Sequence, residues 1–180
     1  MAIIITIMVL ELRAPHGGEL ASLVPLAPVF ESYVLSFVFL GIYWNNHHHM
    51  LQAVRQVNGR ILWSNLYLLF WLSLVPFVTA WMGENHFAAR PVALYGVVLL
   101  MAAIAYYILS RALIRHHGRD SALATAVGSD FKGRISIVFY VVAIAFSFWN
   151  RWAALGIYVL VAVMWLIPDR RIEKTLSESR

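Results

Sequence analysis

The chain has 180 residues, of which 61% are hydrophobic and only 13% are charged, and it contains no cysteine. Soluble domains carry about 25% charged and about 45–50% apolar residues, so this composition and the mean hydropathy of +0.72 indicate a membrane protein. The lack of cysteine excludes disulfides and thiolate metal sites. The net charge is +5, but the basic residues lie in the short gaps between apolar runs, as topology signals do, and this placement argues against a nucleic-acid partner.

The first apolar run, Met1–Leu12, predicts a helix that is apolar on every side and carries one hydroxyl. It is too short to cross a bilayer, which takes about 20 residues, and it lacks the basic lead and cleavage site of a signal peptide. At about 100° per residue, one face of about 100° collects four side chains: Ile3, Thr6, Ile7 and Leu10. From the periodicity alone, ordinary packing against other helices is the preferred explanation of this face.

Five further runs with little or no charge follow a loop at 13–18 and a proline-containing connector at 20–30. They cover residues 32–54, 61–83, 91–110, 135–149 and 152–168, with a kink expected at Pro76. The last two are near the lower length limit for a span. We therefore predict an all-α polytopic membrane protein with six transmembrane helices, the first of them truncated. Residues 1–168 form the membrane domain and 169–180 a charged cytoplasmic tail.

The basic residues test this count through the positive-inside rule. With both termini cytoplasmic, the outer loops hold three of them: Arg13, Arg90 and Arg151. The inner loops and the tail hold eleven: Arg55, Arg60, Arg111, Arg115, Arg119, Lys132, Arg134, Arg170, Arg171, Lys174 and Arg180. The asymmetry gives the orientation of spans two to six, and without the short first span the N-terminus would lie outside. With six spans, we predict a multi-pass protein of the cell (inner) membrane with both termini in the cytoplasm.

Several stretches resemble the transmembrane protein 175 family of potassium channels. The most specific are the opening A-I-I-I-T-I-M-V-L-E-L and the Y-W-N-N-H-H at 43–48; weaker ones are L-W-S-N at 62–65, Y-G at 95–96 and W-L-I-P-D-R-R-I-E at 165–173. The resemblance implies six spans per subunit, a homotetramer in the lipid bilayer, and potassium ions passing through a pore lined by first helices. It implies apolar pore layers at Ile3, Ile7 and Leu10 and a hydroxyl layer at Thr6.

In that family a Phe-Ser-Asp-Gly element precedes the opening run, and it does not occur in this sequence. The resemblance implies that the element binds polar groups at the inner end of the second span, a polar network that we place at Asn45, His47 and His48. We expect the codons upstream of Met1 to encode it, which would make Met1 an internal methionine. If those codons do not encode it, we expect the 180-residue chain to conduct poorly or not at all. A non-conducting remnant is a third possibility besides a channel and a transporter.

The sequence gives little support for a metal-binding site or an enzyme active site. Consecutive residues of a helix point about 100° apart, so His47–His49 cannot converge on one ion, and we predict neither a metal site nor a cofactor. Enzyme motifs are missing, so no enzyme is predicted.

We predict a potassium-permeable cation channel whose pore is closed by apolar rings at Ile3 and Leu10, about 10 Å apart along the axis. The alternative is a small membrane transporter or binding protein that uses the histidine-rich end of the second span.

Overall fold

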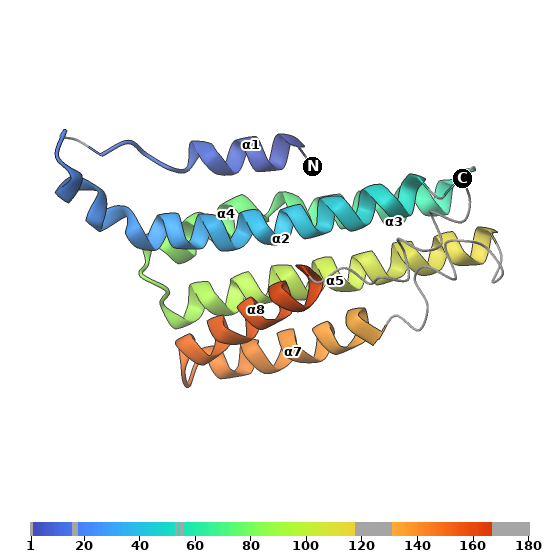
Figure 1. Cartoon of the computed structure of the whole chain (residues 1–180). Helices are drawn as coiled ribbons and strands as arrows, with labels where there is room; N and C mark the ends of the chain where they lie inside the picture. The colour runs from blue at the N-terminus through green and yellow to red at the C-terminus, as the bar shows by residue number, and fades with distance from the viewer. Residues whose placement is uncertain (1, 16–17, 53, 55, 118–130, 167–180) are drawn as a thin grey trace.

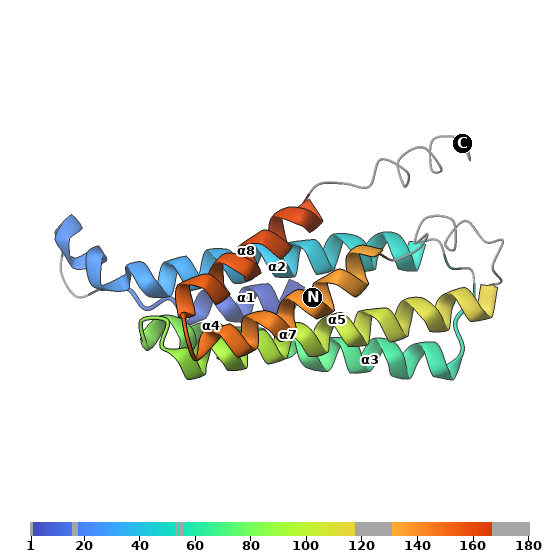
Figure 2. The same ribbon diagram turned by 90° about the horizontal axis from the view of Figure 1, so that it is seen from below.

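A computed structural model describes residues 2–15, 18–52, 54, 56–117 and 131–166 of the chain. Figures 1 and 2 show these residues as an elongated bundle of helices that run roughly parallel or antiparallel to one another. No strand occurs among them, and the predicted all-α fold is confirmed. The elements are α1 (Ala2–Leu10), η1 (Leu20–Leu26), α2 (Ala27–Gln52), α3 (Gly59–Ser73), α4 (Val75–Glu84), α5 (Ala89–His117), α7 (Phe131–Ser147) and α8 (Arg151–Leu166).

The helices match the six predicted spans when α3 and α4 are counted as one. Three stretches of the described chain are long and apolar enough to cross a membrane, namely Leu20–Gln52, Gly59–Glu84 and Ala89–His116. The helices α7 and α8 are apolar but have only 17 and 16 residues, and α1 has nine. Within the described residues, α7 and α8 match the short pair of spans five and six that the sequence predicts, and α1 is shorter than a bilayer crossing.

The second span begins earlier than its sequence suggests. We expected an interfacial connector up to Phe30 and a helix from Ser32, whereas α2 already starts at Ala27 and only η1 occupies the connector. The reason is the position of Pro28, the second residue of α2, because the first turn of a helix has no use for the N–H that proline lacks.

The third span is interrupted, as the proline within it predicts. The helix α3 ends at Ser73 and α4 starts at Val75, with Leu74 between them and Pro76 in the first turn of α4. Pro76 cannot donate the backbone hydrogen bond that the carbonyl of Leu72 would accept in a continuous helix. The two halves have different neighbours, because α3 packs mainly against α5, whereas α4 packs against α2, α5 and α1.

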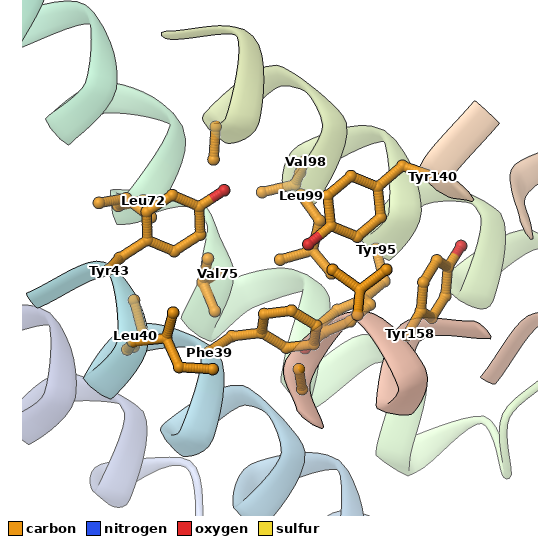
Figure 3. Close-up of a cluster of buried hydrophobic side chains, with 14 of the residues drawn as sticks. Phe39, Leu40, Tyr43, Leu72, Val75, Tyr95, Val98, Leu99, Tyr140 and Tyr158 are labelled. Carbon is orange, nitrogen blue, oxygen red and sulfur yellow. The ribbon is translucent and has the colours of Figure 1, made fainter. Parts of the chain in front are cut away.

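Aromatic rings from four helices form the centre of the core. Phe39 of α2 contacts Tyr95 of α5 and Tyr140 of α7, with centroid distances of 6.5 and 6.4 Å. The ring of Tyr158 on α8 contacts both tyrosines, with centroid distances of 5.7 Å to Tyr95 and 6.2 Å to Tyr140. Figure 3 shows these rings converging between the helices, with Leu99 and Val98 packed beside them. The cluster ties α2, α5, α7 and α8 together.

A chain of hydrogen-bonded hydroxyl groups also connects helices of this core. Thr79 of α4 donates to Ser36 of α2 at 2.6 Å, and the Ser36 hydroxyl lies 3.0 Å from the Tyr95 hydroxyl of α5. All three residues are buried. Polar groups away from water must be paired within the protein, so this chain of hydroxyls favours one register of α2, α4 and α5.

The turn between α4 and α5 carries the two non-glycine residues with positive φ in the described chain, His86 (48°) and Phe87 (56°). Phe87 N–H donates to the Met82 carbonyl and His86 N–H to the Gly83 carbonyl, at 3.0 and 3.1 Å. This is the Schellman pattern that satisfies the last carbonyls of a helix. Phe87 is buried and contacts Trp152 at 5.8 Å, which fixes the turn against α8.

Candidate pore helix and polar groove

The helix α1 has two faces with opposite surroundings. One face packs on α2 and α4, where Met8 is only 1% exposed and Ile4 and Ile5 contact the core. At about 100° per residue these three side chains lie roughly opposite the face that the sequence singled out. Figure 1 shows why, since α1 lies at the edge of the bundle with neighbouring helices on one side only.

The other face of α1 carries the four residues of the predicted pore wall. Ile3 and Leu10 are 73% and 78% exposed, Ile7 is 47% exposed, and Thr6 is exposed between them. The Thr6 hydroxyl donates to the Ile3 carbonyl at 2.8 Å, so its hydrogen is used within α1 and its lone pairs point away from the helix. Within one chain this apolar face therefore has no protein partner among the described residues.

The polar end of α2 lies beside α3 and forms an open groove. His47 Nε2 lies 2.6 Å from Asn65 Oδ1 of α3, and His48 Nε2 lies 2.9 Å from Gln52 Nε2 one turn along α2. The His48 ring also stacks on Trp44, at 5.5 Å and an interplanar angle of 9°. The groove is lined by Trp44, His47, His48, Leu51, Gln52 and Leu69.

The three predicted network residues are close in sequence but are not bonded to one another. The Asn45 side chain is exposed and makes no hydrogen bond to another described residue, whereas the His47 and His48 side chains bond to different partners. Successive positions on a helix point apart, so this separation follows from the helical backbone. Within the described chain no three His, Asp or Glu side chains are placed to hold a metal ion.

Two features of the site were missed by sequence reasoning. Asn65, the partner of His47, was noted only as part of a similar stretch. Thr79 and Ser36 were not singled out, and Tyr95 was noted only as part of a similar stretch, although each hydroxyl lies inside an apolar run, which is the signal that would have found them.

The chain is similar to known proteins along its whole length. Residues 1–76 match the model of the family described as endosomal/lysosomal potassium channel TMEM175. A potassium channel of Chryseobacterium sp. (strain P1-3) is 58% identical over 99% of this chain and 93% of its own length. The chain belongs to the TMEM175 family of potassium channels. The predicted resemblance is thus confirmed, and the family is one of channels and not of enzymes.

More distant members of the TMEM175 family share the architecture. A potassium channel of Chamaesiphon minutus is 29% identical over 90% of this chain and 86% of its own length. The crystal structure of a lysosomal potassium-selective channel TMEM175 homologue from that organism superposes with a TM-score of 0.77, at 27% identity, over 92% of this chain and 90% of the other. This agreement covers the arrangement of the helices.

Proposed function

We propose that four copies of this chain form a potassium-permeable pore in the cell membrane, lined by the exposed face of α1. The observation that carries the proposal is the division of α1 into a packed face and an exposed apolar face. An uncovered apolar helix face can lie against lipid or against further copies of the chain. Relatives named potassium channels favour the second arrangement.

The same face of α1 also supplies the residues that would close the pore. Copies of Ile3 and Leu10 around an axis form two apolar rings about 10 Å apart, and such rings close a narrow pore by excluding water. Thr6 lies between the rings and offers hydroxyl oxygens to a partly dehydrated cation. The sequence contains no T-V-G-Y-G loop, so a carbonyl filter of that kind does not contribute to ion selection.

Charge supports an orientation with both termini in the cytoplasm. The described carboxylates Glu11, Glu19, Glu31 and Glu84 belong to the end of the bundle where α2 begins and α4 ends, whereas Arg60, Arg111 and Arg115 belong to the opposite end. The chain contains no cysteine, so single cysteines at Ser22 and at Ser121, which lies outside the described residues, report the two sides directly. We expect the cysteine at 121 to react from the cytoplasm; its reaction from outside would contradict the six-span orientation.

The pore is tested by potassium flux into liposomes. Ile3→Asn or Leu10→Ala is expected to let water into an apolar ring and to raise the flux severalfold. Val9→Asn is the matched control, because Val9 is also exposed on α1, at 44%, but lies outside the predicted arc. Equal flux from the wild type and from both pore variants, or an equal increase in Val9→Asn, would contradict the pore assignment.

The same assay separates the channel from a transporter that uses the groove at His47 and His48. A channel passes ions in proportion to the driving force, whereas a transporter saturates and, with histidine as its ionisable group, couples to protons. We expect His47→Gln and His48→Gln to leave an unsaturated flux. A saturating flux that either variant abolishes would favour the transporter.

A further inference from the structure

One end of the bundle carries a cluster of exposed arginines. The first residues of α3 and the last residues of α5 meet there, joined by a hydrogen-bond contact of 3.2 Å between Asn58 Nδ2 and His116 Nδ1. Arg60 of α3 and Arg111 and Arg115 of α5 are all exposed at this end. Arg111 and Arg115 are one turn apart, so they share a side of α5. We call these three residues the arginine cluster.

Within the described residues, none of the three guanidinium groups has a carboxylate partner. The described carboxylates, Glu11, Glu19, Glu31 and Glu84, belong to the opposite end of the bundle. Arg111 Cζ lies 5.0 Å from the centre of the Tyr107 ring. The three arginines therefore have no carboxylate partner within the described residues.

The surface next to the cluster is that of a membrane interface. Trp63, one turn from Arg60 along α3, is 73% exposed, and Leu66 and Phe70 continue the exposed apolar surface with 54% and 52%. On α5 the ring of Tyr107 and the 42% exposed Ile108 follow Arg111 in the same direction. Aromatic residues next to basic ones mark the headgroup level of a bilayer, with apolar side chains facing the acyl region.

We propose that the arginine cluster binds the phosphate of anionic lipids, with phosphatidylglycerol as the representative headgroup. A guanidinium group matches a phosphate through two parallel hydrogen bonds, and the exposed apolar residues beside it accommodate the acyl chains. A zwitterionic headgroup offers the same phosphate but carries its own cation. The proposal is independent of the pore, since it uses neither the exposed face of α1 nor the groove.

The test is a lipid titration of the purified full chain in detergent micelles, read as the shift of its thermal unfolding midpoint. Each basic residue near an anionic surface contributes about fivefold in affinity. The triple variant R60Q/R111Q/R115Q is therefore expected to need on the order of 100-fold more phosphatidylglycerol for the same shift. The matched control is R13Q/R90Q/R151Q, which removes three exposed arginines of the other end and is expected to respond like the wild type.

Two further arms identify the ligand. Phosphatidylcholine is expected to give a much smaller shift than phosphatidylglycerol, and inorganic phosphate at matched ionic strength is expected to give none. R60K/R111K/R115K keeps the charge and is expected to keep most of the lipid effect, so it separates charge from misfolding if the glutamine variant unfolds. Equal losses in both glutamine triples, equal shifts from both lipids, or a full shift from inorganic phosphate would each overturn the proposal.

Discussion

The hydroxyl of Tyr158 fills the space that a Cβ atom at Gly96 would occupy. From this position Tyr158, on α8, donates a hydrogen bond of 3.1 Å to the backbone carbonyl of Val92, one turn before Gly96 on α5. The contact joins a side chain of one helix to the backbone of another inside the apolar core. The lack of a side chain at residue 96 thus sets how closely α8 approaches α5.

We predict that Gly96→Ala destabilises the protein by about 1–3 kcal/mol, because the added methyl group must displace the Tyr158 ring in a packed core. Gly156→Ala on α8 is the matched control, since nothing lies within 4 Å of a Cβ at that position. There the better helix propensity of alanine is expected to leave stability unchanged or raise it by up to about 1 kcal/mol. Thermal unfolding in detergent measures both, and equal effects would contradict the assigned close approach.

We predict that Ser36→Ala costs about 1–3 kcal/mol, because it leaves the buried Tyr95 hydroxyl without its partner. Adding Tyr95→Phe to this variant removes the unpaired hydroxyl and is expected to recover part of the loss. Ser73→Ala is the control, because its exposed hydroxyl donates to the Phe70 carbonyl of its own helix and makes no hydrogen bond to another helix of the described chain. Additive effects of Ser36→Ala and Tyr95→Phe in a double-mutant cycle would show that the two hydroxyls are not coupled.

Glycine substitutions at His86 and Phe87, in the turn between α4 and α5, are expected to change stability in opposite directions. His86→Gly is expected to stabilise the protein by about 1 kcal/mol, because glycine adopts the positive φ of this position without steric cost. Phe87→Gly relieves the same strain but removes a buried ring that contacts Trp152, so it is expected to destabilise. Unfolding midpoints measure both, and a loss of stability in His86→Gly would contradict the αL assignment.

Adjacent residues of α1 allow a test of which face meets the ions. Cysteine at Ile7 places a thiolate on the proposed pore wall, and Cd²⁺ bound there is expected to block potassium flux reversibly. Cysteine at Met8 is the neighbouring control, because Met8 is buried against α2 and α4. Block of the Met8→Cys variant but not of the Ile7→Cys variant would place the opposite face of α1 towards the pore.

Much of the fold follows from the sequence because lipid imposes a simple rule on the backbone. Apolar runs without charge must be helices whose polar groups are paired internally, and this gives the number of spans and the break near Pro76. The start of α2 was predicted too late, since two prolines suggested a connector where Pro28 in fact belongs to a first helical turn. Local sequence shows a proline but not which turn of a helix will receive it.

The site was only partly predictable. Periodicity collected Ile3, Thr6, Ile7 and Leu10 on one face, and no described residue covers that face, but their role as a pore wall remains a proposal. The pairing of His47 with Asn65 joins positions 18 residues apart on two helices. Such contacts depend on how helices pack, and the pattern of one segment contains no information about its neighbour.

The break at Leu74 divides one predicted membrane span into two helical segments, α3 and α4, with different neighbours. The segment before it, α3, packs mainly against α5, whereas the segment after it, α4, packs against α2, α5 and α1, so α1 contacts α4 directly. Bending at this break breaks no helical hydrogen bond to residue 76, because Pro76 has no N–H to lose. The two halves of this span therefore meet where the helical hydrogen-bond ladder is already interrupted, with the half that bears Arg60 packed on α5 and the other half in contact with α1.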